Sequence, residues 1–178
     1  VANMSGTKEA EIIKITKKQK KRNPTAPFIT SSMLIEAARQ LGFATDKTTR
    51  VAQSLYEGIE LQGESVGLIT YMRTDSVQLS PIAIEEIREY IGNNFDERYL
   101  PSTPNVYSSK SKNAQEAHEA IRPTSIMRKP ESIKAYLSLD QYRLYELIWR
   151  RTLASQISSA IFDTTAVDIK LNDGVFRV

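Results

Sequence analysis

A tyrosine, an arginine and an aspartate alternate along one short stretch of the chain, GLITYMRTDS, residues 67–76. A phenol is a poor nucleophile at neutral pH because its pKa is about 10, unless nearby positive charge stabilises the phenolate. Arg73 could supply that charge, and its guanidinium fork could hold two phosphate oxygens while phosphorus is attacked. In an extended segment, Tyr71 and Arg73 would project from the same face. The pattern therefore suits a tyrosine that attacks a phosphate.

Each of these residues also has an ordinary structural interpretation. The chain has eight tyrosines, and most of them are expected to be core or rim aromatics. Arg73 could as easily pair with Asp75 or with a surface carboxylate. His118 is the only histidine, and a lone histidine on a helix is more often a surface or core side chain than a ligand. Spacing alone does not decide between these roles.

Other catalytic classes have weaker support. The chain lacks cysteine, which excludes disulfides, thiolate metal sites and cysteine nucleophiles, and a zinc site with one histidine would be unusual. The stretch GESVG, residues 63–67, has neither the ending of a phosphate-binding P-loop nor the spacing of a dinucleotide fingerprint. No GxSxG motif supports a serine hydrolase.

Helical periodicity dominates the middle of the chain, and twofold alternation marks its two ends. Helices are predicted at residues 30–41, 45–61, 81–91, 114–121, 130–137 and 138–158, and strands at 10–18 and 167–178. The stretch at residues 68–72 is too short and too rich in β-branched residues to be a helix. The predicted helix caps are Ser80, Asp140, and Thr45 or Asp46. The buried stripes are expected to include Leu34, Ile35, Ala38, Leu41 and Tyr56.

The fold class expected from these elements is α+β and predominantly helical. A helical domain at residues 28–157 would be inserted between a strand and linker at residues 1–27 and a β-hairpin at residues 158–178. The terminal strands would then belong to a partial β-domain.

The net charge of +3 is small, but six basic residues crowd into KITKKQKKR, residues 14–22. This block is either a solvated strand end or a patch that faces phosphate.

No run of about 18 apolar residues could cross a bilayer, and the absence of cysteine suits a reducing compartment. We therefore expect a cytoplasmic protein with no membrane partner. The first residue is valine and the last stretch is GVFRV, so we expect an excised segment of a larger protein.

Four stretches together resemble the central part of the bacterial DNA topoisomerase I family, which is type IA: GLITYMRTDS, QEAHEAIRP, AQSLYEG and PTAPFITSS. The resemblance covers residues 24–149. It implies an isomerase in which Tyr71 attacks a phosphate of single-stranded DNA and forms a 5′-phosphotyrosine. Another strand then passes and the break is resealed, which relaxes negatively supercoiled duplex DNA without ATP.

The same resemblance implies roles for further residues. Arg73 would hold the scissile phosphate, His118 would position DNA, and Arg122 would support one of these two tasks. Asp75 would orient Arg73 or His118. Thr45 and Lys47 would meet the DNA backbone, since the start of a helix offers free N–H groups and a positive dipole end.

In that family Mg²⁺ is bound by an acidic Toprim domain that precedes this region, and the chain has no matching DxD cluster. We therefore expect no metal site here, the remaining domains of the same polypeptide as partners, and an isolated chain that cannot relax DNA. Two alternatives stay open. One is a helical DNA-binding module without catalysis, and the other is a scaffold without a nucleic-acid role.

Overall fold

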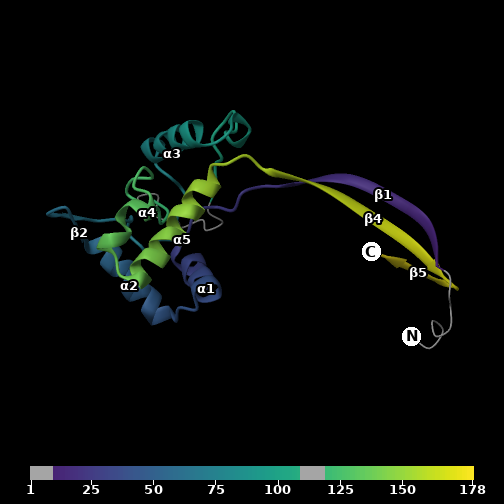
Figure 1. The fold of residues 1–178 in the computed structure, drawn as a ribbon, viewed down its shortest axis with the longest axis horizontal. Helices are drawn as coiled ribbons and strands as arrows, with labels where there is room; N and C mark the ends of the chain where they lie inside the picture. Colours follow the sequence, from purple (N-terminus) through teal and green to yellow (C-terminus); the bar gives the residue numbers. More distant parts are fainter. Residues whose placement is uncertain (1–9, 109–118) are drawn as a thin grey trace. The chain divides into compact units, whose positions relative to one another are not determined.

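The computed structural model describes residues 10–108 and 119–178, and Figure 1 shows their fold. The helices are α1 (Thr30–Leu41), α2 (Thr45–Glu57), α3 (Pro81–Asn94), α4 (Pro130–Ile133) and α5 (Leu139–Ser155), with 3₁₀ turns η2 (Glu97–Tyr99) and η3 (Lys134–Tyr136). The strands are β1 (Glu11–Arg22), β2 (Ile59–Leu61), β3 (Glu64–Val66), β4 (Ala160–Leu171) and β5 (Gly174–Arg177).

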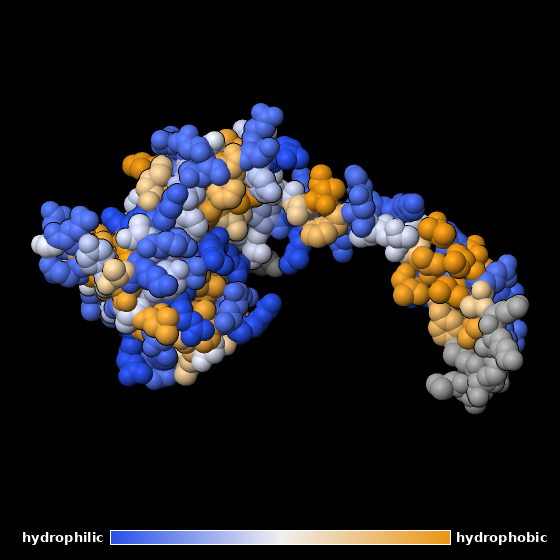
Figure 2. Space-filling view, in the orientation of Figure 1, coloured by the Kyte–Doolittle hydropathy of each residue, from blue (hydrophilic) through white to orange (hydrophobic). Residues whose placement is uncertain are grey.

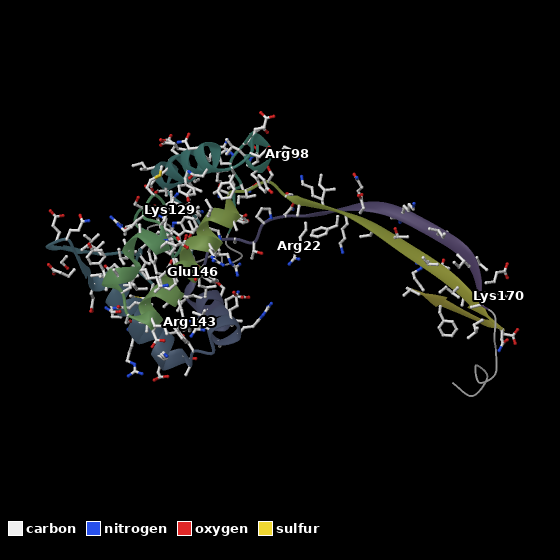
Figure 3. The ribbon with its side chains drawn as sticks, viewed as in Figure 1. Arg22, Arg98, Lys129, Arg143, Glu146 and Lys170 are labelled. Carbon is white, nitrogen blue, oxygen red and sulfur yellow. The ribbon has the colours of Figure 1, made fainter. Side chains whose placement is uncertain are left out.

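The chain divides into two compact units, one made of residues 24–158 and the other of the strands on either side. In the second unit, β1, β4 and β5 form an antiparallel sheet in that order. The ladder between β1 and β4 runs from the Glu11–Lys170 pair to the Arg22–Ala160 pair, with one irregularity near its start. Arg22 and Lys170 mark its two ends in Figure 3. The correspondence of the units to the expected domains 1–27, 28–157 and 158–178 stays a prediction.

Basic residues of β1 lie on both faces of the sheet, where residues paired across the antiparallel ladder project to the same side. One side carries Lys14, Lys18, Lys20 and Arg22, and the other carries Lys17 and Lys21. Near β5, the other side carries exposed apolar residues, which Figure 2 shows gathered on the sheet: Ile12, Ile15 and Phe176, with Val167 and Ile169 between them.

The expectation of a predominantly helical fold is wrong. Of the described residues, 42% are helical and 24% are in strands, which makes the fold mixed α/β. One cause is that β4 begins at Ala160 rather than at residue 167, and another is the length of β1, which continues through the basic run to Arg22. That run lacks hydrophobic alternation, so its strand character is not visible in the sequence. Hydrogen bonding to β4 extends the strand, and nearly all of its side chains are exposed, which leaves the charges in water.

In the other unit, the main core lies where α1, α2 and α5 meet the segment that precedes Tyr71. Its fully buried members include Phe28, Met33, Leu55, Leu68, Ile69, Met72, Ile121, Leu144, Tyr145 and Ile148. A smaller cluster joins α3 to the end of α5 through Ile87, Ile91 and Leu153. The residues on both sides of Tyr71 are thus part of the core, which fixes the course of the backbone there.

Some predicted helix ends are confirmed and others are wrong. Ser80 caps α3 by accepting a hydrogen bond from the Ala83 N–H, and Gly42 ends α1 with a φ of 69°. The N-cap of α5 is Ser138 rather than Asp140, and the N-cap of α2 is Ala44, whose side chain makes no capping bond. The predicted caps were wrong by one or two residues because several polar residues stand at each helix start.

The predicted buried stripe of α1 is also wrong in phase. The helix buries Met33 and Ala37, whereas Ile35 is 63% exposed. Tyr56 of α2 is likewise exposed. Apolar residues occupy more than one side of α1, so the sequence allows two stripes, and packing against α2 and α5 selects one of them.

Candidate active site

Burial alternates along the segment that carries Tyr71, which bends at Met72 and Arg73. Met72, Thr74 and Ser76 are buried, whereas Tyr71, Arg73 and Asp75 are exposed, with Tyr71 at 40%. Tyr71, Arg73 and Asp75 therefore face the solvent together, while Met72 anchors the same segment in the core.

Hydrogen bonds hold this segment on the side before Tyr71. The Thr70 N–H donates to the Arg122 carbonyl at 2.9 Å, and the Thr70 hydroxyl donates to the Ala120 carbonyl at 2.7 Å. The Arg122 N–H in turn donates to the Thr70 hydroxyl at 3.0 Å. Ile69 forms a bridge with Pro123. The residues just before Tyr71 are therefore paired with residues about Arg122, far along the chain.

A second anchor lies on the side after Tyr71, and it comes from the start of α1. The Thr30 hydroxyl donates to the Met72 carbonyl at 2.7 Å and accepts from the Thr74 N–H at 2.9 Å. The Thr30 N–H donates to the Thr74 carbonyl at 2.9 Å. In the sequence, Thr30 is only the first residue of the helix predicted at residues 30–41. Its contact with residues 72–74 has no sequence signal, because the partners are more than forty residues away.

The ring of Tyr71 packs against the ring of Tyr56, the residue before the last of α2. The ring centroids lie 5.3 Å apart and the planes are tilted by 59°. Aromatic pairs at this distance contribute about 0.5–1.5 kcal/mol beyond the area they bury. This neighbour was missed in the sequence, where Tyr56 was assigned to the buried stripe of its helix.

Arg122 lies close to the segment but is held by protein groups. Two guanidinium nitrogens contact the same Glu119 carboxylate oxygen at 2.7 Å, and a third donates to the Pro123 carbonyl at 2.9 Å. The Arg122 side chain is only 15% exposed. Partial burial raises the pKa of Glu119, but hydrogen bonds from Ser80 and Arg122 outweigh that effect and lower the pKa below its usual value. Arg122 and Glu119 therefore form a charged pair.

Thr45 and Lys47 both lie in the first turn of α2. Thr45 is exposed, whereas Lys47 is half-buried and its Nζ lies 2.8 Å from a carboxylate oxygen of Asp140 on α5. The same ammonium group lies 4.3 Å from the centre of the Phe43 ring. Lys47 thus links α2 to α5, and any DNA phosphate would have to compete with Asp140 for it.

His118 and most of the helix predicted at residues 114–121 lie outside the described residues. The described end of that stretch is not helical, since Ile121 forms a bridge with Phe28. The helix prediction is therefore wrong at its end. Pairing with Phe28, Thr70 and Gln78 takes up the backbone hydrogen bonds of residues 120–122 instead.

No group of three or more His, Asp or Glu side chains that could hold a metal ion occurs within residues 10–108 and 119–178. These residues therefore do not fit a Mg²⁺ site, and no chemical step is assigned to a metal here. In the same part of the chain, no helix has the length and apolar character needed to cross a membrane.

Comparison with known proteins places the chain in a family. The family described as DNA topoisomerase matches residues 1–178, and the chain belongs to it. DNA topoisomerase 1 of Xylella fastidiosa is 57% identical over 168 residues, which are 93% of this chain and 21% of that protein. DNA topoisomerase 1 of Rickettsia felis is 56% identical over 156 residues, 88% of this chain and 20% of that protein.

A solved structure gives the same result. Full-length topoisomerase I from Thermotoga maritima superposes with a TM-score of 0.83 at 39% identity, covering 99% of this chain and 28% of that one. The resemblance to bacterial DNA topoisomerase I seen in the sequence motifs is thereby confirmed. The chain spans about a fifth of the length of the curated relatives.

Proposed function

We propose that this chain carries the nucleophile of a type IA DNA topoisomerase, and that the nucleophile is Tyr71. One observation carries the proposal. Tyr71 and Arg73 are both exposed on a short segment whose backbone is hydrogen-bonded on both sides. Membership of the DNA topoisomerase family supports it further.

In the proposed reaction, the Tyr71 oxygen attacks a phosphate of single-stranded DNA and gives up its proton. The bond between phosphorus and the 3′ oxygen breaks, that oxygen takes up a proton, and the 5′ phosphate stays on Tyr71. One phosphate ester replaces another, so the free 3′-hydroxyl can reverse the step without ATP. Arg73 would stabilise the charge that builds on the phosphoryl oxygens.

Passage of another strand through the break would relax negatively supercoiled DNA. The protein would act in the cytoplasm, with the remaining domains of the same polypeptide completing the enzyme and its Toprim domain binding Mg²⁺. Asp75, on the same face as Arg73, would orient the guanidinium. His118, Arg122, Thr45 and Lys47 would contact DNA, and the ion pairs of Arg122 and Lys47 with Glu119 and Asp140 would have to open or be shared.

The test is covalent trapping in a full-length enzyme that carries this segment. A single-stranded oligonucleotide labelled at its 3′ end is incubated with the enzyme, and the labelled protein is digested and its modified peptide mapped. Tyr71→Phe is expected to bind the oligonucleotide with nearly unchanged affinity and to form no adduct. Tyr136→Phe is the matched control, because Tyr136 is a similarly exposed tyrosine at 43%, and it is expected to keep the adduct. An adduct on any other residue would refute the proposal.

The non-catalytic alternative, a helical DNA-binding module, predicts a different result. Binding would be salt-sensitive and would survive Tyr71→Phe, but no adduct would form with either protein. The exposed basic residues of β1 are the observation that favours it. A scaffold without a nucleic-acid role predicts no binding of single-stranded DNA even at low salt.

The inactivity of the chain alone is a separate proposal. The purified 178-residue chain is expected to leave a negatively supercoiled plasmid unchanged on an agarose gel in the presence of Mg²⁺. Relaxation at a rate comparable to that of a full-length enzyme would contradict it.

A further inference from the structure

Arg73 is bracketed by hydrogen bonds to a single side chain. The Thr30 hydroxyl binds the carbonyl of Met72, which precedes Arg73, and the N–H of Thr74, which follows it. A hydroxyl can donate one hydrogen bond and accept others at the same time, so it can serve both groups. The backbone N–H of Thr30 adds a further bond to the Thr74 carbonyl.

These bonds do not form a helix cap. The N-cap of α1 is Ile29, and the Ile29 N–H is bound by the Ser32 hydroxyl. The side chain of Thr30 is thus available for residues 72–74, and it ties the start of α1 to the exposed segment. With the Thr70 anchor on the other side, residues 71–73 are held from both ends.

Segments outside a sheet lack the hydrogen-bond ladder that fixes which face each side chain occupies. Here the Thr30 hydroxyl takes the place of a neighbouring strand for the Met72 carbonyl and the Thr74 N–H. Without it, the backbone about Arg73 could rotate, and the guanidinium would lose its position relative to the Tyr71 oxygen. Displacing a reacting group by about 1 Å can cost a reaction about 100-fold in rate.

We propose that Thr30 is a positioning residue for Tyr71 and Arg73. The inference rests on the proposed function, since it assigns Thr30 a role in the same reaction. The hydroxyl of Thr30 is bound to backbone groups of the protein, so no contact with DNA is assigned to this residue. It acts through the backbone of Met72 and Thr74, and its role is to keep both side chains on one exposed face.

The test uses a full-length enzyme carrying this segment and compares Thr30→Val with Thr30→Ser. Valine keeps the shape of threonine without the hydroxyl, and serine keeps the hydroxyl. The rate of adduct formation is measured at saturating oligonucleotide, and affinity is measured separately by fluorescence anisotropy. We expect Thr30→Val to slow adduct formation by about 10- to 100-fold with affinity changed less than about 3-fold, and Thr30→Ser to restore most of the rate.

Thr48→Val is the matched control. Thr48 is buried in α2, and its hydroxyl donates to the Ala44 carbonyl at 3.0 Å, so this variant also loses a bond from a threonine to the backbone. It is expected to lower the melting temperature without changing the rate at saturation. If Thr48→Val slowed the reaction as much as Thr30→Val, or if Thr30→Val reacted at the normal rate, the positioning role would be overturned.

Two further variants keep the outcome decisive. If Thr30→Val does not fold, Thr30→Ala replaces it, because alanine also lacks the hydroxyl, and a normal rate in that variant overturns the inference. Tyr71→Phe is run in parallel. An adduct in Tyr71→Phe would refute the proposed function itself, whereas its loss together with a normal rate in Thr30→Val would refute only the role of Thr30.

Discussion

The pair between Arg122 and Glu119 is expected to stabilise the fold and to restrain DNA binding, so Glu119→Gln should change the two properties in opposite directions. Both side chains are mostly buried, with exposures of 15% and 29%. Hydrogen bonds to charged groups contribute about 1.5–3 kcal/mol, and pairs in full solvent contribute less than about 1 kcal/mol. Because glutamine retains one acceptor oxygen, we expect a loss of about 1–2 kcal/mol in unfolding free energy.

Heat unfolding monitored by circular dichroism measures this loss. A chain of this length should lose about 2–4 °C in melting temperature for each kcal/mol. Asp46→Asn is the control, since Asp46 pairs with Arg50 at 3.1 Å but both side chains are at least 75% exposed. We expect Asp46→Asn to lower the unfolding free energy by less than about 0.5 kcal/mol. Equal melting temperatures for Glu119→Gln and Asp46→Asn would show that the partly buried pair contributes nothing extra.

The sign of the pH dependence follows from the lowered pKa of Glu119. The contribution of the pair is complete above the unfolded-state pKa of this carboxyl, and it is lost as the pH falls through the lower folded-state pKa. The stability difference between the parent protein and Glu119→Gln should therefore shrink in that acidic range. In a full-length enzyme, the same variant should bind single-stranded DNA several-fold more tightly, because Arg122 no longer has a carboxylate partner. Weaker DNA binding would refute this reasoning.

Three further predictions concern other parts of the helical unit. Tyr145→Phe removes a buried hydroxyl that donates to the Arg128 carbonyl at 2.7 Å, which should cost about 1–2 kcal/mol in urea unfolding. Burial raises the pKa of Tyr145, so its contribution is complete below the unfolded-state pKa of about 10 and is lost at higher pH. The parent protein should therefore lose more stability than Tyr145→Phe between about pH 9 and 11, and equal losses would contradict this. Ser138→Ala removes the cap of α5 and should cost about 1 kcal/mol in the same assay, whereas no change would mean that the cap is dispensable. Gly67→Ala would place a Cβ 2.8 Å from the Tyr56 carbonyl oxygen, so it should destabilise the fold by about 1–3 kcal/mol and slow adduct formation through the ring contact with Tyr71. A normal rate of adduct formation would show that the close contact between Gly67 and the Tyr56 carbonyl tolerates a methyl group.

Local rules in the sequence located the elements near the candidate site. A serine followed by a proline predicts the start of α3, and a glycine predicts the end of α1. The turn residues between Leu171 and Gly174 predict the β4–β5 hairpin. Twofold side-chain alternation also predicted that Tyr71 and Arg73 would share a face if the segment were extended. These features depend on residues only a few positions apart, which is why the sequence contains them.

Features that depend on distant residues were missed or misassigned. The phase of the buried stripe on α1 depends on the neighbours that it packs against, and the length of β1 depends on pairing with β4. The anchoring of Met72 and Thr74 by Thr30, and the ring contact with Tyr56, join segments that are separate in the sequence. Arg122 was expected near DNA, and its pairing with Glu119 was missed although the two residues are only three positions apart, a spacing at which side chains of a helix meet.

The sequence by itself determined the residue types of the candidate site, their alternation and the family to which the chain belongs, because these are properties of short motifs. Tertiary structure decided how that site is held. Only the folded chain brings the start of α1, the end of α2 and the residues about Arg122 to the segment of Tyr71. Hydrogen bonds and ring contacts between such segments form when the core closes, and no local propensity specifies them.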